Sequence, residues 1–167
     1  KRRPSLSFEL VGGQKEDVIY WKDKSVNLPN VVFRGHAQPK DLHSYYARFD
    51  IVLAPYQLGV NQGDEKTDTT KWMSPMKIFE YMAFGLPIIC SDIPVLREIL
   101  NKNNAILVSP SNLDAWCTAL DQLQNPSLRK RLGDNAHETV ATNYTWEIRA
   151  KKILNAVLSE PTIKTSV

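Results

Sequence analysis

The chain has 167 residues, of which 43% are apolar and 23% charged, and its formal net charge is +3. This length suits one domain with a substantial core, and the composition is typical of a soluble globular protein. So small a net charge, without a long basic run, argues against nucleic acid as a partner. No apolar stretch is long enough to span a membrane and no signal peptide is visible, so we expect a cytoplasmic protein. Since the sequence begins with Lys1 rather than Met, we interpret it as part of a longer protein.

Short apolar runs alternate with amphipathic stretches along most of the chain. In chain order we expect a strand over 8–11, a helix over 16–24, a strand over 31–33, a helix over 39–48, a strand over 50–54, a helix over 75–84, a strand over 88–90, a helix over 94–100, a strand over 105–108, and helices over 113–123, 127–141 and 145–158. Glycines and prolines mark many boundaries: Gly12-Gly13 ends the first strand, Pro39 and Pro94 begin helices, and Gly85 ends one.

Residues 56–73 interrupt this alternation. The stretch is polar, carries Gly59 and Gly63, and includes the mixed-charge run Asp64-Glu65-Lys66. Long loops in compact domains are often lids or binding loops, so we expect a functional loop here.

The alternation of strands and helices predicts the fold class. Helices of this length between strands imply right-handed crossovers, and therefore a Rossmann-like α/β fold with a parallel sheet, helices on both faces and a helical C-terminal tail. Ligands of such sheets bind outside the carboxyl ends of the strands. The residues expected to gather at that edge are Gly12-Gly13, Arg34-Gly35-His36, Pro55-Tyr56, Ser91-Asp92 and Ser109.

Cysteine and histidine placement limits the chemistry. Cys90 and Cys117 lie in apolar surroundings and are expected to be buried free thiols in a reducing compartment. No set of His, Cys and carboxylate residues has metal-ligand spacing, so we expect no metal. No serine or cysteine has a visible base partner either, which argues against a hydrolase of the serine or cysteine type.

The segment Ser74 to Glu80 departs from ordinary helix-start chemistry. Ser74 is a favourable cap and Pro75 suits the first helical position. A glutamate at the third position would complete a capping box, but this helix has Lys77 there. A cation in the first turn faces the positive end of the helix dipole, which costs a few tenths up to about 1 kcal/mol. A bound anion would reverse that cost, so the segment is a candidate phosphate site.

Glu80 lies three residues after Lys77, on the same helix face. A carboxylate one turn beyond a phosphate site is well placed to accept hydrogen bonds from ribose hydroxyls, as acidic residues do in other nucleotide sites. The plainer interpretation is an exposed Lys77–Glu80 ion pair that contributes little. These residues alone leave both interpretations open.

A family resemblance favours the functional interpretation. The run SPMKIFEYMAFGLPIICSDIPVLREIL resembles the most recognisable stretch of the family-4 retaining glycosyltransferases (group 1), which have the two-domain GT-B fold. SFELVGG resembles the first strand and glycine turn of their C-terminal domain, and VVFRGHAQPKDLHSYYARFDIVLAPY the strand–helix–strand that follows. NAILVSPSNLDAWCTALDQLQNPSLRKRLGDNA resembles their closing strand and helices. The resemblance covers nearly the whole chain and implies the donor-binding, C-terminal half of such an enzyme.

The resemblance also implies residue roles. Glu80 matches the second glutamate of the family's glutamate–seven residues–glutamate motif, which typically binds the donor ribose, and Lys77 and Glu80 are the residues implied in catalysis. The donor-binding residues implied are Gly12 and Gly13 in the turn that approaches the donor, Arg34, Gly35 and His36 in the loop beside the base, and Ser74, Pro75, Met76, Lys77 and Glu80 at the diphosphate, the sugar and the ribose.

The chain departs from the family pattern in two places. The first glutamate of the motif, which lies near the donor sugar in the family, falls at position 72, where this chain has Trp72. Trp72 is either a structural side chain or a surface for a sugar to stack on, and the alternative acids in the loop are Asp64, Glu65 and Asp68. The family's diphosphate-binding Arg and Lys lie upstream of the first strand, and residues 1–3 do not match their spacing.

The implied reaction is transfer of a hexose from a UDP- or GDP-sugar to a glycan or lipid-linked acceptor, with retained anomeric configuration. The Ser-Pro-x-Lys form resembles a subset that builds bacterial surface polysaccharides such as lipopolysaccharide. The resemblance implies a donor domain over 1–158, a flexible tail over 159–167, and an N-terminal acceptor domain absent from this sequence. It implies no metal and no further cofactor. We therefore expect the isolated domain to be inactive, and the full protein to make weak peripheral contact with the inner membrane face.

Two kinds of alternative stay open. One is another enzyme of this architecture, such as a nucleotide-sugar epimerase or a sugar-phosphate transferase. The other is a degenerate domain that binds sugar nucleotides without catalysis, which Trp72 allows. A receiver-like signalling domain needs acids after the first strand, where this chain has Gly12-Gly13, and a dinucleotide-binding domain needs the missing Gly-x-Gly-x-x-Gly.

Overall fold

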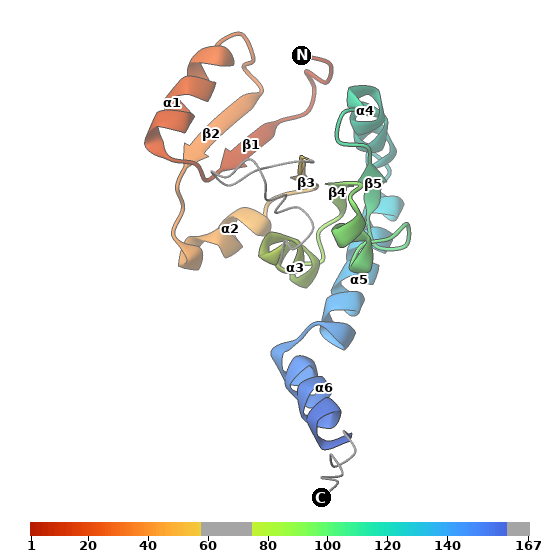
Figure 1. Cartoon of the computed structure of the whole chain (residues 1–167). Coiled ribbons are helices and arrows are strands. Elements are labelled where there is room, and N and C mark those ends of the chain that lie inside the picture. Colours follow the sequence, from red (N-terminus) through yellow and green to blue (C-terminus); the bar gives the residue numbers. More distant parts are fainter. Residues whose placement is uncertain (58–74, 160–167) are drawn as a thin grey trace, which may run out of the picture. The chain divides into compact units, whose positions relative to one another are not determined.

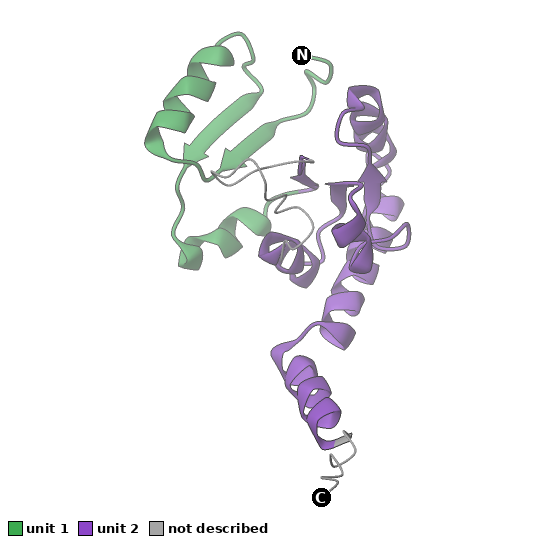
Figure 2. Ribbon diagram, in the orientation of Figure 1, with its two compact units in different colours: residues 1–49 green, residues 50–167 purple. Residues whose placement is uncertain are grey.

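The computed structural model describes residues 1–57 and 75–159 (Figure 1). The chain divides into two compact units, Lys1–Phe49 and Asp50–Val167 (Figure 2). Each unit has its own parallel sheet with helices connecting the strands, so the predicted α/β class is confirmed. The described strands form these two sheets rather than one continuous hydrogen-bonded sheet.

The first unit is built around a pair of parallel strands. Its elements are β1 (Phe8–Val11), α1 (Lys15–Lys24), β2 (Val31–Gly35), the 3-10 helix η1 (Pro39–Asp41) and α2 (Leu42–Tyr46). Phe8 lies opposite Val31, and the ladder continues to Val11 opposite Gly35, with a shift in register before Val11. Parallel neighbours need a crossover, which α1 supplies.

The second unit contains a three-stranded parallel sheet in the order β3-β4-β5. Its elements are β3 (Val52–Ala54), α3 (Met76–Ala83), β4 (Ile88–Ser91), the 3-10 helix η3 (Pro94–Glu98), β5 (Ile106–Val108), α4 (Leu113–Gln122), α5 (Pro126–Asn143) and α6 (Trp146–Ser159). The strand and helix positions predicted from the sequence are confirmed to within a few residues, including the helical C-terminal part.

The core of the second unit surrounds β4. Ile88, Ile89 and Cys90 are all 0% exposed, as expected for the middle strand of a sheet covered on both faces. Helix α3 contributes Ile78 and Met82 to this core, which lie one turn apart on its buried face.

Helices α3 and α5 meet at two glycines. Gly85, with φ +63°, ends α3 in the left-handed conformation that favours glycine. A Cβ atom placed on Gly133 of α5 would lie 2.1 Å from the carbonyl oxygen of Gly85. His137, one turn further along α5, has its Nδ1 atom 2.9 Å from the carbonyl oxygen of Ala83. The close approach therefore depends on the absence of a side chain at position 133.

Three local expectations need correction. Pro75 is the N-cap of α3 and not its first helical residue, because its ψ of 74° is not helical; Ser74 lies outside the described residues. The segment after Ile93 forms a 3-10 helix of five residues, not an α-helix reaching residue 100. Cys117 is half-buried, whereas Cys90 is buried as expected, and both thiols are free.

Within the described ranges, no helix combines the length and the apolar character needed to cross a membrane.

Candidate functional site

In the first unit, the carboxyl ends of β1 and β2 lie together. The amide of Gly12 donates a hydrogen bond to the carbonyl oxygen of Gly35 over 2.7 Å. Gly12, Gly13 and Gly35 have φ values of +117°, +89° and +74°, which residues with a Cβ rarely adopt. The predicted donor-side glycines therefore lie together where the two strands end, and we call this place the glycine turn. The side chains of Arg34 and His36, on either side of Gly35, are exposed.

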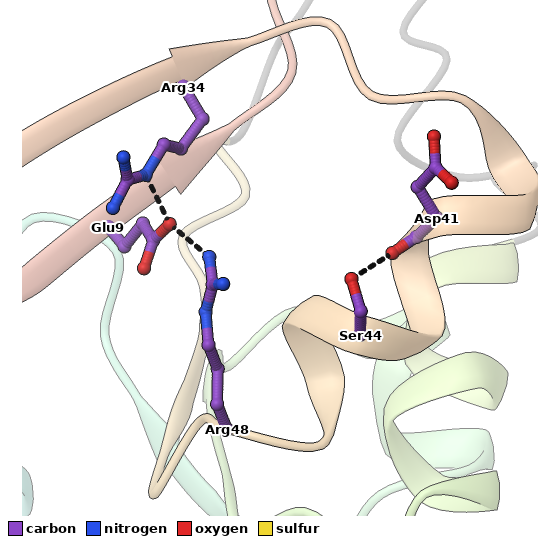
Figure 3. A network of polar contacts seen from close by, with 5 residues as sticks. All are labelled: Glu9, Arg34, Asp41, Ser44 and Arg48. Atoms are coloured by element: carbon purple, nitrogen blue, oxygen red, sulfur yellow. Dashed lines mark hydrogen bonds and ion pairs between the residues drawn. The ribbon is translucent and has the colours of Figure 1, made fainter.

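Arg34 belongs to a charge network that the sequence reasoning missed (Figure 3). The Glu9 Oε1 atom accepts hydrogen bonds from Arg34 Nε over 2.6 Å and from Arg48 Nη2 over 2.5 Å. Partial desolvation raises the pKa of Glu9, but the two guanidinium groups outweigh it and hold that pKa below its ordinary value. An acid in the middle of the apolar run Phe8–Val11 was the one sequence signal for such a network.

In the second unit, the residues after β3, β4 and β5 follow a shared sheet edge. Ala54 pairs with Cys90 and Ser91 pairs with Val108, and the amide of Asp92 donates to the carbonyl oxygen of Val108 over 2.8 Å. The predicted gathering of strand ends is therefore confirmed within this unit.

Two polar groups at this edge are notable. Arg97 donates two hydrogen bonds to the Asp92 carboxylate, over 2.6 and 2.9 Å, and these bonds hold the pKa of Asp92 below its ordinary value despite some desolvation. Ser91 is completely buried, and its Oγ atom makes no hydrogen bond within the described part of the chain. Asp92 is thus committed to Arg97, while the Ser91 hydroxyl has no assigned partner in the described ranges.

The start of α3 carries the predicted phosphate and ribose residues. Pro75 is buried, Met76 is 57% exposed, Lys77 is exposed and Glu80 is half-buried. The amide of Ile78 donates to the carbonyl oxygen of Pro75 over 2.9 Å, whereas the amides of the first helical residues have no acceptor inside an α-helix. No ion pair joins Lys77 to Glu80 in the described ranges, and the roles of the two residues stay predictions.

Weakly acidic side chains lie on α3 and beside it. Burial raises the pKa of Tyr56, and the neighbouring Cys90 adds to that shift. Burial, and then Tyr56, Glu80 and Cys90, raise the pKa of Tyr81. Burial also raises the pKa of the Cys90 thiol to about 12. These groups stay neutral at ordinary pH, so Glu80 stands at the margin of a dry region rather than in open solvent.

The candidate residues therefore fall into two groups, one in each unit: the glycine turn with Arg34 and His36, and the first turns of α3. Trp72 and the loop acids Asp64, Glu65 and Asp68 lie outside the described residues. No three His, Cys, Asp or Glu side chains in residues 1–57 and 75–159 are grouped as a metal site would need, and the absence of a metal stays a prediction.

Solved structures share this fold. Sucrose-phosphate synthase from Thermosynechococcus elongatus is similar in structure, with 20% sequence identity and a TM-score of 0.69. The match covers 94% of this chain and 40% of the synthase chain. Anabaena Alr3699/HepE, solved in complex with UDP, is also similar, with 18% sequence identity and a TM-score of 0.71. That match covers 94% of this chain and 42% of the HepE chain. The fold is thus that of GT-B glycosyltransferases.

The sequence places the chain within the same class. Residues 1–155 match the glycosyl transferase-like family, and the chain belongs to that family. It is 22% identical over 160 residues to a GDP-mannose-dependent monoacylated alpha-(1-6)-phosphatidylinositol monomannoside mannosyltransferase of Corynebacterium glutamicum, covering 95% of this chain and 40% of that protein. It is 31% identical over 81 residues to the O-antigen biosynthesis protein RfbC of Myxococcus xanthus, covering 48% of this chain and 6% of that protein.

The chain spans 6% to 40% of the curated relatives it matches. The family membership does not favour an epimerase or a purely binding domain over a glycosyltransferase.

Proposed function

We propose that this chain is the donor-binding, C-terminal half of a retaining glycosyltransferase. The observation that carries the proposal is the start of α3, where exposed Lys77 lies in the first turn and half-buried Glu80 one turn later. The donor is a nucleoside diphosphate hexose with UDP or GDP as its nucleotide, and the acceptor is a glycan or a lipid-linked glycan.

The first turn of α3 suits a leaving diphosphate. Its first amides, which have no acceptor inside the helix, and the positive end of the helix dipole attract an anion, and Lys77 adds a full positive charge. Negative charge grows on the diphosphate as the bond to the sugar breaks, so groups fixed at that point stabilise the transition state more than the bound donor. Lys77 is therefore assigned to the diphosphate.

Glu80 suits the ribose. A carboxylate accepts hydrogen bonds and donates none, which matches the two hydroxyl donors of a ribose. Its half-buried position beside Tyr81 lowers the competition from water for those bonds. In the glycine turn of the first unit, a Cβ placed at Gly12 or Gly35 would meet nothing within 4 Å. The space beside the backbone is therefore open, and a ligand can come close to it.

Names of similar proteins support the class of donor and acceptor. HepE was solved in complex with UDP and glucose, and the Corynebacterium relative is described as GDP-mannose-dependent. The proteins for O-antigen biosynthesis and for the lipopolysaccharide outer core suggest a surface-polysaccharide acceptor. We place the protein in the cytoplasm, where exposed Lys152 of α6 attracts it weakly to an anionic membrane.

Calorimetric titration of the 167-residue chain with UDP and with GDP tests the proposal. We expect weak binding of one nucleotide and no sugar transfer by this chain alone. Glu80→Ala should weaken binding about tenfold, since a hydrogen bond to a charged group contributes about 1.5–3 kcal/mol. Glu138→Ala, an exposed glutamate of α5, is the matched control and should bind as the wild type does. Equal binding by wild type and Glu80→Ala contradicts the ribose assignment.

A further inference from the structure

The end of α3 is capped by a side chain from another helix. The last four carbonyl groups of an α-helix have no donor inside the helix. In α3 the carbonyl groups of residues 80–82 accept from the amides of residues 84–86. The fourth carbonyl, that of Ala83, lies 2.9 Å from the Nδ1 atom of His137 in α5. A carbonyl oxygen only accepts, so Nδ1 carries the proton, and His137 completes the C-terminal cap of α3.

Helix α5 contacts α3 a second time, at Phe79. The rings of Phe79 and Tyr144 pack together, with centroids 5.2 Å apart and planes inclined by 48°. Tyr144 is the C-cap residue of α5, and its hydroxyl donates to the Glu98 carbonyl over 3.1 Å, which fixes the ring. The close approach of Gly133 to Gly85 adds a backbone contact beyond the end of α3. Helix α5 therefore restrains α3 at several points along its length.

These contacts lie on one face of α3 and leave another face accessible. Phe79 and Ala83 are four residues apart, so they share a helix face. At about 100° per residue, Glu80 lies about 100° from Phe79 around the helix axis, and Lys77 about 160°. Lys77 is exposed and Glu80 is half-buried. Helix α5 thus holds α3 from the side that faces away from Lys77.

We propose that His137 and Tyr144 are positioning residues for sugar transfer, which hold α3 so that its first turn and Lys77 meet the diphosphate in one orientation. The inference rests on the proposed donor-binding function. Groups that stabilise developing charge are most effective when they are already in place, because moving them during the reaction costs free energy. Such groups have to be held to within about 0.5 Å by contacts behind them. His137 and Tyr144 supply contacts of this kind to α3.

Steady-state kinetics of the full-length enzyme test this, with a UDP- or GDP-sugar as donor and each variant assayed well below its Tm. His137→Ala removes the hydrogen bond and should lower kcat about tenfold, a part of the about 10²-fold loss that a displacement of about 1 Å can cause. KM for the donor should change less than about twofold, because the charge that Lys77 meets grows only as the bond breaks.

Two further variants control for the chemistry of the histidine. His137→Asn keeps an amide donor close to the position of Nδ1, so it should restore kcat to within about threefold of the wild type. His43→Ala is the matched control, since the Nδ1 atom of His43 also lies beside a carbonyl oxygen, that of Lys40 at 2.6 Å, in the first unit. It should leave kcat unchanged.

A double variant separates positioning from general stabilisation. Independent changes multiply their effects on kcat, whereas a residue that acts through another has little effect once that other is gone. Adding His137→Ala to Lys77→Ala should therefore lower kcat by less than about threefold, against about tenfold when Lys77 is present. If His137→Ala does not fold, Tyr144→Phe replaces it in the same cycle, because it keeps the ring that packs on Phe79 and loses the bond to Glu98.

The outcomes distinguish this inference from the proposed function. An unchanged kcat in His137→Ala, or in Tyr144→Phe where that variant replaces it, overturns the inference and leaves the donor function standing. A loss in His137→Asn as large as in His137→Ala also overturns it, and so does an undiminished loss in the Lys77→Ala background. If the wild-type enzyme transfers no sugar from either donor, the proposed function fails and the inference falls with it.

Discussion

Replacing Gly133 with alanine tests how closely α5 must approach the end of α3. An added Cβ would lie 2.1 Å from the Gly85 carbonyl oxygen and 3.0 Å from the Gly85 carbonyl carbon, whereas ordinary contacts are 3.4–4 Å. Both obstructing atoms belong to the backbone, so no side-chain rotation relieves the overlap. The two segments must separate by more than 1 Å, from 2.1 Å to at least 3.4 Å.

The expected net cost follows from two opposing effects. Overpacking of this kind costs about 1–3 kcal/mol, and a backbone obstruction should reach the upper end of that range. Alanine in place of glycine inside a helix recovers about 1 kcal/mol. The difference is a loss of about 2 kcal/mol in the free energy of unfolding, which for a chain of this size lowers Tm by about 4–8 °C.

Thermal and urea unfolding followed by circular dichroism measure this loss. The control is the reverse exchange at an exposed position of the same helix, Ala141→Gly, which should cost at most about 1 kcal/mol. Gly133→Ala should therefore destabilise the chain more than Ala141→Gly, although alanine is the better helix former. If Gly133→Ala were as stable as the wild type, the α3–α5 packing described above would be wrong.

Three further predictions concern single side chains. Asn104 is 1% exposed, accepts from the Asn101 amide and donates to the Ile99 carbonyl, so Asn104→Ala should cost about 1–3 kcal/mol in urea unfolding. Ser91→Ala removes an equally buried hydroxyl that has no partner among the described residues, so it should change the free energy of unfolding by less than about 0.5 kcal/mol. Equal losses in Asn104→Ala and Ser91→Ala would contradict the hydrogen bonds assigned to Asn104. Cys90 is buried and the pKa of its thiol is raised to about 12, whereas Cys117 is half-buried. Iodoacetamide at pH 8 should therefore label Cys117 first, and both cysteines only after denaturation, as followed by mass spectrometry. Labelling of Cys90 before Cys117 would contradict its burial. Because the folded pKa of Glu9 is below its ordinary value of 4.5, its ionised form contributes stability above pH 4.5 that disappears as the pH falls through the folded pKa. The Tm difference between wild type and Glu9→Gln should accordingly be largest near neutral pH and shrink on acidification, and a constant difference would argue against the ion pairs.

The sequence predicted the strands and helices well because their limits are local. Apolar runs such as Phe8–Val11 and Ile88–Ser91 end at glycine, proline or polar turn residues, and these act within a few residues of the boundary. The order of strands within a sheet depends on contacts between distant segments. That information is absent from local pattern, which is why the division into two described sheets was not foreseen.

Errors in the local predictions came from proline. Proline fixes φ but leaves ψ open, so Pro75 could serve either as the first helical residue or as the residue before it. Its carbonyl accepts from the Ile78 amide, which makes it the N-cap. Pro94 likewise marks a helix start, but the helix that follows is a five-residue 3-10 helix, in which Leu96 is buried.

The candidate site was predictable where one short segment carries it. Lys77 and Glu80 are three residues apart, so their shared helix face follows from helix geometry alone. Glu9 and Arg48 are separated by 39 residues, and only the tertiary structure brings them together. An acid inside an apolar strand indicates that a partner exists, but the sequence does not say which arginine it is.

The cations near the candidate sites differ in how far their charge is already neutralised. Arg34 is held by Glu9 and Arg97 by Asp92, whereas Lys77 makes no hydrogen bond or ion pair with the described residues. A guanidinium that is fixed by a carboxylate is suited to holding or reading a ligand in one orientation. On the proposed function, a lysine that no acid of the described ranges neutralises keeps its charge for the diphosphate, whose own charge grows as the sugar departs.

On the proposed function, this difference makes Lys77 the cation whose loss should slow sugar transfer most. In the full-length enzyme, Lys77→Ala should lower kcat about 10²-fold, the effect of losing one group that stabilises developing negative charge. Lys102→Ala, an exposed lysine of the same unit, is the control and should leave kcat unchanged. KM for the donor should change much less than kcat, because the added charge on the diphosphate exists only while the bond breaks. A Lys77→Ala enzyme with a raised KM and an unchanged kcat would assign Lys77 to donor binding alone and remove it from the chemical step.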